Sequence, residues 1–170
     1  MKKILIMMIG APGSGKSTYV SNNLKDGQVW ISRDAIRYSM VKENEDYFSK
    51  ENEVINTFIQ SINKCLSPKS SYTHIIADAT HLSPKSRGIV LNQITEHYDE
   101  LIGVYFDIPL EVVQKRNAQR QGRERVPAAI VANMYRSMRI PTKDEGFTSV
   151  FIIDENNKTK SIIRYKEEEK

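Results

Sequence analysis

Short apolar runs alternate with longer amphipathic stretches along most of this chain. Five runs carry few charges, as strands buried on both faces of a sheet do. They lie at Lys3–Ile9, Gln28–Ser32, His74–Asp78, Leu101–Asp107 and Ser149–Asp154. The stretches between them predict helices at Lys16–Leu24, Asp34–Met40, Tyr47–Cys65, Pro84–His97, Pro109–Gln119 and Pro127–Arg139. Strand–helix alternation of this kind predicts a three-layer α/β fold with a mainly parallel central sheet.

The last part of the chain has the pattern of a hairpin. Phe151–Asp154 and Ser161–Tyr165 are joined by the turn-forming residues Glu-Asn-Asn-Lys. The acidic run Glu167–Glu169 predicts a solvated tail. Because neither a repeat nor a low-complexity linker interrupts the pattern, we expect a single domain over residues 1–170.

Composition narrows the class of protein. Hydrophobic residues make up 39% and charged residues 27% of the 170 positions, which is ordinary for a globular protein. The single cysteine, Cys65, excludes an internal disulfide and a cysteine-based zinc site. No segment approaches the roughly 20 apolar residues that cross a bilayer, so we expect a cytoplasmic protein with no membrane contact. The net charge of +4 permits a nucleic-acid partner without requiring one.

One motif dominates the candidate chemistry. The spacing G-x-x-x-x-G-K-S follows the first predicted strand and opens a predicted helix, which is the context of a phosphate-binding loop. Its residues are Gly10, Ala11, Pro12, Gly13, Ser14, Gly15, Lys16 and Ser17, with Thr18 next in the helix. Backbone N–H groups of such a loop surround phosphates, the lysine reaches the β and γ phosphates, and the serine holds Mg²⁺. The motif therefore predicts binding of ATP or GTP with Mg²⁺.

A carboxylate and a guanidinium follow the second strand. Asp34 and Arg37 are three residues apart at the opening of a helix, so they project from one face. A helix-capping aspartate with a surface ion pair would look the same. Ligands of parallel sheets gather beyond the carboxyl ends of the strands, and we therefore favour a site. Asp34 could accept the proton of an attacking hydroxyl, and Arg37 could hold an anion on that molecule.

The third strand, His74–Asp78, ends in a carboxylate. An aspartate at a strand end that helps to hold Mg²⁺ or its waters has this pattern, and we assign Asp78 that role with Ser17. Thr80 and His81 follow and are expected to face the same crevice, where either could contact a substrate.

Arginines crowd the region after the fourth strand. Arg116 and Arg120 share a helix face, and Arg123 and Arg125 lie in a glycine-containing connection before Val126. We interpret this region as a lid, because arginines that close over a phosphoryl group stabilise its charge and exclude water. Arg116 and Arg120 are the lid residues expected to contact the nucleotide.

Taken together, these segments resemble the 5′-hydroxyl kinase domain of phage polynucleotide kinase, within the broader group of small P-loop kinases. The resemblance spans roughly Lys2 to Arg139 and rests on GAPGSGKST, SRDAIRYSM, IIADATHLSP, FDIPLEVVQKRNAQR and VPAAIVANMYRSM. It implies Lys16 and Ser17 on the ATP phosphates and Mg²⁺, and Asp34 as general base. It further implies Arg37 on the 3′-side phosphate of the acceptor and Arg120 on the transferring group. Acceptor-pocket positions are matched by Arg33, Thr80 and Val126.

The chain also departs from this family. His81 stands where the family pattern has an amide, and the phosphatase signature Asp-x-Asp of the phage enzyme is missing, so we expect no 3′-phosphatase activity. The sequence favours a kinase acting on the 5′-hydroxyl of DNA or RNA in nucleic-acid repair. A small-molecule kinase for a nucleoside, sugar or antibiotic hydroxyl, and an ATP-binding switch module, stay open as alternatives. Nothing in the sequence indicates an oligomeric state.

Overall fold

A computed structural model gives the fold and describes residues 1–165, so the predicted tail at Glu167–Glu169 lies outside the described residues. The strands are β1 (Ile4–Ile9), β2 (Gln28–Ser32), β3 (His74–Asp78), β4 (Glu100–Phe106), β5 (Ser149–Ile153) and β6 (Thr159–Arg164). The α-helices are α1 (Lys16–Asn23), α2 (Arg33–Met40), α3 (Glu51–Leu66), α4 (Pro84–Leu91), α5 (Leu110–Ala118) and α6 (Ala128–Ser137). Short 3-10 turns cover Gly122–Glu124 and Lys143–Glu145.

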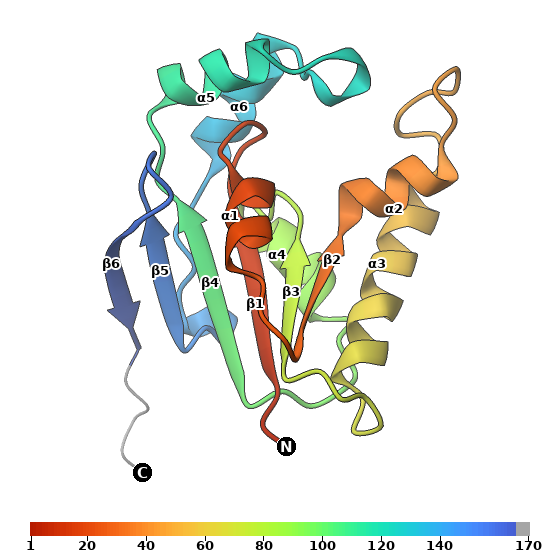
Figure 1. The fold of residues 1–170 in the computed structure, drawn as a ribbon, viewed down its shortest axis with the longest axis vertical. Coiled ribbons are helices and arrows are strands. Elements are labelled where there is room, and N and C mark those ends of the chain that lie inside the picture. Colours follow the sequence, from red (N-terminus) through yellow and green to blue (C-terminus); the bar gives the residue numbers. More distant parts are fainter. Residues whose placement is uncertain (166–170) are drawn as a thin grey trace.

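The strands form one sheet in the order β2-β3-β1-β4-β5-β6 (Figure 1). Strands β1 to β5 are parallel, and β6 returns antiparallel to β5 as the predicted hairpin. The α/β class, the mainly parallel sheet and the helices on both faces are confirmed. The carboxyl ends of β1, β2 and β3 consequently meet at one edge of the sheet, where the phosphate loop, α2 and the loop after Asp78 begin.

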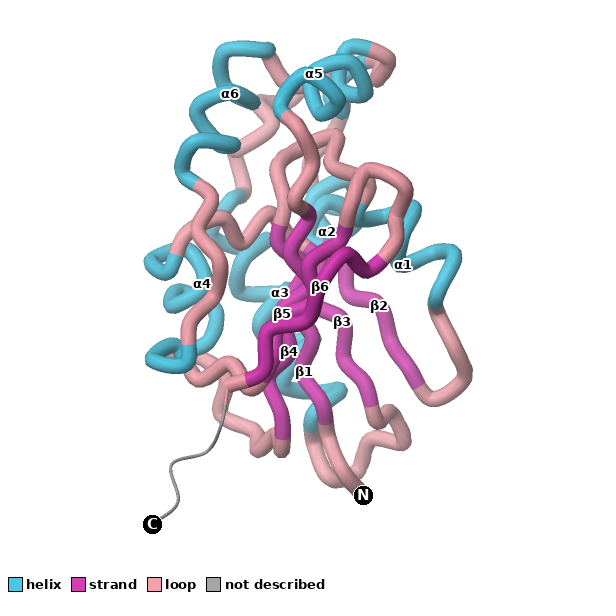
Figure 2. The backbone as a smooth tube through the Cα atoms, turned by 90° about the vertical axis from the view of Figure 1, so that its left-hand side faces the viewer, coloured by secondary structure: helices cyan, strands magenta, loops and turns pink. Residues whose placement is uncertain are grey.

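The core lies on both faces of the sheet because side chains alternate along each strand. Leu5 and Met7 of β1 pack with Phe58 and Ile62 of α3. Met8 belongs to the cluster on the other face, which includes residues of α1, α5 and α6. Figure 2 shows α4 and α1 on opposite sides of the strands, and α5 and α6 above their upper ends. This three-layer arrangement leaves the functional loops at one end of the molecule.

Two predicted helices have different limits. The helix predicted over Pro84–His97 ends at Leu91, because Asn63 of α3 accepts a hydrogen bond from the Thr95 backbone N–H and so holds that segment outside the helix. The helix predicted over Tyr47–Cys65 begins only at Glu51. Its first four predicted residues form turns, and this difference places Tyr47 and Phe48 beside α2. The predicted limits of β2 and β3 match the observed ones, and the other limits differ by at most two residues.

Among residues 1–165, no helix combines the length and the apolar character that crossing a membrane would require. The longest helix, α3, has 16 residues, and its polar face carries charged side chains. The region from α5 through α6 lies across the carboxyl ends of the strands (Figure 1) and has the position that the sequence predicts for the arginine-bearing lid.

Candidate active site

A cavity of about 710 Å³ opens at the carboxyl ends of β1, β2 and β3. The phosphate loop and α1 form one wall, the opening of α2 with the segment before α3 forms a second, and the lid forms a third. The predicted residues that line it are Pro12, Gly13, Gly15, Lys16, Ser17, Thr18, Arg33, Asp34, Arg37, Asp78, Thr80, Arg116, Arg120 and Val126. One cavity thus brings together most of the side chains that the sequence singled out.

The phosphate loop has the geometry of an anion cradle. Gly13 and Gly15 adopt φ values of 86° and 94°, in the left-handed region that other residues rarely adopt. A side chain on Gly13 would also collide with α5, because its Cβ would lie 2.8 Å from the Val113 carbonyl oxygen. These glycines keep the loop open, and Lys16, the first residue of α1, stands at its mouth.

Lys16 is held ready inside the loop by hydrogen bonds from its Nζ to the carbonyl oxygens of Gly10 at 2.8 Å and Ala11 at 3.2 Å. Loss of hydration lowers the pKa of Lys16, and the carboxylates of Asp78 and Asp34 oppose that effect. Gly10, Ala11 and Ser14, which the sequence assigns to the nucleotide, do not line the cavity. Instead these three residues are buried within the loop, and the carbonyl oxygens of Gly10 and Ala11 position the lysine.

Asp78 is fixed by Trp30 of the neighbouring strand. The indole Nε1 donates a hydrogen bond of 2.9 Å to Asp78 Oδ2, and the aspartate is 5% exposed. Burial raises the pKa of Asp78, whereas Lys16 and the indole hydrogen bond lower it. Within residues 1–165, no three His, Cys, Asp or Glu side chains gather into a metal-binding group. The donor set, one serine and one carboxylate beside a phosphate cradle, fits Mg²⁺ that arrives with a nucleotide and keeps much of its water.

Asp34 and Arg37 meet as predicted, and two unpredicted residues join them. Arg37 Nη1 donates to Asp34 Oδ1 at 2.7 Å, Nη2 donates to Glu51 Oε2 at 2.7 Å, and the Tyr47 hydroxyl donates to Asp34 Oδ1 at 3.1 Å. The Asp34 side chain is nevertheless 59% exposed, whereas that of Arg37 is 5% exposed. Asp34 is therefore an oriented carboxylate that a substrate hydroxyl can reach.

Glu51 links the two arginines of α2. Its carboxylate pairs with Arg33 through Oε1 and with Arg37 through Oε2. Burial alone would lower the pKa of Arg37, but its contacts with Glu51 and Tyr47 outweigh burial and raise it. Neither Glu51 nor Tyr47 could be predicted from the sequence, because their contacts join α2 to residues ten or more positions away.

Lid arginines make three different contacts. Arg116 donates to the carbonyl oxygens of Ser14 at 3.3 Å and Glu155 at 2.6 Å, and so ties the phosphate loop to the β5–β6 turn. Arg123 reaches the Val41 carbonyl at 2.7 Å, with its guanidinium 4.4 Å from the centre of the Tyr38 ring. Within residues 1–165, Arg120 donates only to the nearby Glu124 carbonyl at 3.1 Å, and its positive charge contributes to the lowered pKa of Lys16. Of the three, Arg120 lines the cavity and has only this local hydrogen bond among the described residues, whereas Arg116 and Arg123 reach distant segments.

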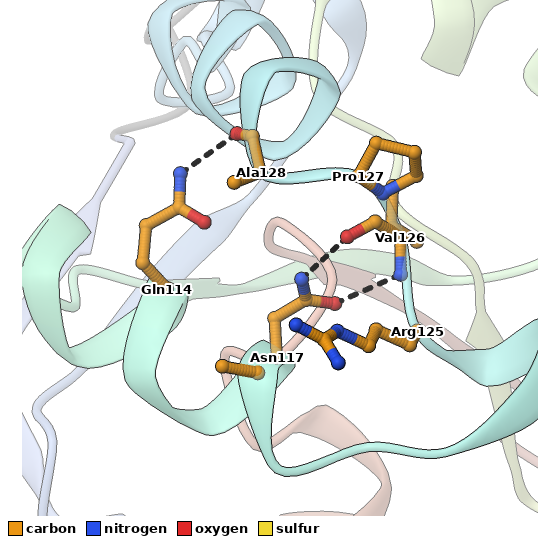
Figure 3. Close-up of a pocket in the computed structure, with 7 residues that line it drawn as sticks. Gln114, Asn117, Arg125, Val126, Pro127 and Ala128 are labelled. Carbon is orange, nitrogen blue, oxygen red and sulfur yellow. Dashed lines mark hydrogen bonds between the residues drawn. The ribbon is translucent and has the colours of Figure 1, made fainter.

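Asn117 fixes the wall that carries Val126 (Figure 3). Its Nδ2 donates to the Val126 carbonyl at 2.6 Å, and the Val126 N–H donates back to Oδ1 at 3.1 Å. Gln114 adds a hydrogen bond of 2.8 Å to the Ala128 carbonyl, beside a small cavity of about 290 Å³. Asn117 also packs against Gly13 of the phosphate loop. Asn117 thereby connects the phosphate loop to the part of the lid that carries Val126.

The expectation that His81 faces the crevice is wrong. His81 is 3% exposed, adopts φ 45° and does not line the cavity. The left-handed backbone turns its ring inward, where Nδ1 meets the Met8 carbonyl oxygen at 2.9 Å and the ring packs near Phe58. Burial lowers the pKa of His81 to about 4, and the cations Arg33, Lys16 and Arg87 act in the same direction. Thr80 does line the cavity, as expected.

His81 predicts an acid-sensitive contribution to stability. Its pKa is lower in the folded chain than the ordinary 6.5, so this contribution is complete above pH 6.5 and is lost as the pH falls towards 4. Urea unfolding at neutral and acidic pH measures the acid loss, which is the decrease in the free energy of unfolding between the two. We expect this acid loss to be smaller by roughly 3 kcal/mol in His81→Asn, because asparagine does not titrate. Asparagine also tolerates positive φ and can donate to the Met8 carbonyl. His97→Asn, at an exposed histidine, should leave the acid loss unchanged. Equal acid losses in wild type and His81→Asn would contradict this assignment.

The fold and the cavity together define the class: this is a P-loop kinase fold, with the phosphate loop between β1 and α1 and a lid over the strand ends. The chain belongs to the AAA_33 family, described as an AAA domain, whose model matches residues 5–141.

Two curated relatives carry names with different acceptors. An L-seryl-tRNA(Sec) kinase from Methanococcus maripaludis is 27% identical over 147 residues, which are 81% of this chain and 53% of that protein. A protein of Acanthamoeba polyphaga mimivirus, named as a candidate bifunctional polynucleotide phosphatase/kinase, is 27% identical over 157 residues, 88% of this chain and 32% of that protein. The chain thus spans about half of one relative and a third of the other.

Solved structures share the fold. A chain of the Pnkp1/Rnl/Hen1 RNA repair complex gives a TM-score of 0.66 at 23% identity, over 80% of this chain and 44% of that one. A sugar kinase from Janibacter sp. HTCC2649 gives 0.61 at 17% identity, over 92% and 87%. Proteins named for different acceptors therefore share this architecture, and the fold by itself does not select one acceptor.

Proposed function

We propose that this chain is an ATP-dependent kinase that transfers the γ-phosphate to the 5′-hydroxyl end of DNA or RNA, as in nucleic-acid repair. The observation that carries the proposal is the meeting, in one cavity, of Lys16 with the accessible carboxylate of Asp34. A phosphate donor and a base for an acceptor hydroxyl need this juxtaposition. The mimivirus relative and the RNA repair neighbour support a nucleic-acid acceptor.

On the donor side, the triphosphate of ATP, or of GTP, would lie along the loop from Gly13 to Thr18. Lys16 would exchange its two carbonyl partners for phosphate oxygens. The negative charge of those oxygens would stabilise the ammonium group, which has lost part of its hydration through burial. Arg116 and Arg120 would meet the phosphates from the lid. When bound, Mg²⁺ would be held by Ser17, with Asp78 on its waters, and would neutralise charge on the β and γ phosphates.

On the acceptor side, Asp34 would take the proton of the 5′-hydroxyl as that oxygen attacks the γ-phosphorus. The new O–P bond forms while the bond to the bridging oxygen of ADP breaks, and ADP leaves. Arg37 orients Asp34 and would share its remaining N–H capacity with the 3′-side phosphate of the acceptor. Arg33, Thr80 and Val126 would line the acceptor pocket. Arg120 would neutralise charge on the transferring group.

A kinase for an uncharged small alcohol, such as a nucleoside, sugar or antibiotic, is the second candidate. The observation that favours it is the pairing of Arg37 with both Asp34 and Glu51, which already compensates the arginine charge. An acceptor without a phosphate would leave that network intact. The sugar kinase fold neighbour is consistent with this possibility.

A transfer assay with γ-labelled ATP and Mg²⁺ tests the proposal. The acceptors are a 5′-hydroxyl DNA oligonucleotide, the matching RNA, a nucleoside 3′-monophosphate, a nucleoside and a hexose. We expect the three phosphate-bearing acceptors to have kcat/KM values at least about tenfold above those of the nucleoside and hexose, since a charge-assisted contact contributes roughly 1.5–3 kcal/mol. Higher turnover of an uncharged alcohol would overturn the polynucleotide assignment. ATP hydrolysis at the same rate with and without acceptor would indicate a switch module, and Lys16→Ala controls for contaminating kinases.

A further inference from the structure

Three aromatic rings form a cluster at the mouth of the cavity. Tyr38 on α2 lies 6.3 Å from Tyr47, and Tyr47 lies 4.9 Å from Phe48, both in edge-on contacts between ring centres. All three line the cavity. Phe48 is 63% exposed, whereas the two tyrosines are partly buried. The cluster therefore ends in a phenylalanine that contributes little to the core.

Cations lie against this aromatic cluster. The guanidinium carbon of Arg37 is 4.7 Å from the Tyr47 ring centre and 5.6 Å from that of Phe48. The guanidinium of Arg123 covers Tyr38 from the lid side. Exposed aromatic rings interleaved with arginines are the pattern by which proteins hold single-stranded nucleic acid, because bases stack on the rings and the cations attract the backbone.

Position along the cavity wall adds a direction to this pattern. Arg37 contacts both Asp34 and Phe48: its Nη1 lies 2.7 Å from Asp34 Oδ1, and its guanidinium carbon lies 5.6 Å from the centre of the Phe48 ring. A nucleic-acid strand has its groups in the same order: the 5′-hydroxyl, the 3′-phosphate of the first nucleotide, and then the base of the second nucleotide. If the hydroxyl is at Asp34 and the phosphate at Arg37, the next base reaches Phe48.

We propose that the Phe48 ring is a stacking site for the base of the second nucleotide of a single-stranded acceptor. This inference rests on the proposed function and deepens it, since it predicts that an acceptor of two or more nucleotides, unpaired at its second position, binds more tightly than a nucleoside 3′-monophosphate. A base paired within a duplex keeps its own stacking partners and cannot turn onto the ring.

A double-mutant cycle in binding tests the stacking site. The variants are wild type and Phe48→Ala, and the ligands are 3′-fluorescent 5′-hydroxyl tetranucleotides with either a normal or an abasic second position. We expect Phe48→Ala to weaken binding of the normal ligand by roughly five- to a hundredfold, the range for loss of one base–aromatic stack. The abasic ligand should bind both proteins equally, and Phe48→Trp should bind the normal ligand as wild type does.

Controls separate stacking from a loss of structure. Tyr72→Ala removes another exposed ring outside the cavity and should leave both affinities unchanged. Equal weakening of the normal and abasic ligands by Phe48→Ala would overturn the proposal, as would no weakening of either. Because affinity is measured without transfer, the cycle stands apart from the kinase assay. A coupling between the Phe48 ring and the second base without phosphate transfer would refute the proposed kinase. Phosphate transfer without that coupling would refute the stacking site.

Discussion

Replacing Asp34 by asparagine is expected to lower kcat for transfer to a 5′-hydroxyl oligonucleotide by roughly 10²- to 10⁴-fold, the usual contribution of a general base. The amide oxygen can still accept the hydrogen bonds from Arg37 and from the Tyr47 hydroxyl, so the local geometry should persist. What is lost is the ability to take the proton from the attacking oxygen. Labelled transfer under saturating ATP measures the effect.

Binding and stability should change little in this variant. The Asp34 side chain is more than half exposed, so its pair with Arg37 contributes little to folding. We expect the Kd for ATP to stay within about twofold and the Tm within a few degrees, because a surface substitution away from the core usually costs about 0.5 kcal/mol or less. Glu43→Gln removes a carboxylate from the segment between α2 and α3 and should retain full transfer. Full activity in Asp34→Asn would remove the general base from the mechanism.

The fold was predictable because its signals are local. Apolar runs mark the buried parallel strands, and the phosphate-loop spacing marks the junction of β1 and α1. The pair Asp34 and Arg37 was predictable for the same reason, since residues three apart on a helix always share a face. Helix ends were less predictable. Leu91 ends α4 where Asn63, from a distant helix, takes over the backbone N–H of Thr95.

Other parts of the candidate site depend on tertiary contacts that leave no pattern in the sequence. Trp30 reaches Asp78 only because β2 and β3 are neighbours with Ser32 opposite Asp78. Glu51 becomes a partner of α2 only because α3 starts four residues later than its amphipathic pattern predicts. The prediction that His81 faces the cavity is wrong because the direction of its side chain depends on one backbone angle, the positive φ, and not on its position after a strand.

Arg120 is the second residue whose loss should be severe. We expect Arg120→Ala to lower kcat by roughly 10³-fold or more, the lower end of what a single arginine contributes to phosphoryl transfer. Its guanidinium is half-buried in the lid, donates within residues 1–165 only to the Glu124 carbonyl, and contributes to the lowered pKa of Lys16. A cation in this position stabilises charge that develops on the γ-phosphate oxygens, which is greatest in the transition state.

The distribution of the loss between kcat and KM distinguishes this role from a structural one. Loss of an arginine that acts only in the transition state lowers kcat and kcat/KM together and leaves the KM for the acceptor nearly unchanged. Arg120→Lys should recover only part of the rate, because an ammonium group cannot reproduce the planar, two-pronged contact of a guanidinium. Lys115→Ala removes an exposed positive charge from α5, the helix that precedes Arg120, and should leave kcat unchanged. A rise in acceptor KM with kcat intact would instead make Arg120 a binding residue, and the charge that develops on the γ-phosphate would then be stabilised by Lys16 and Arg116.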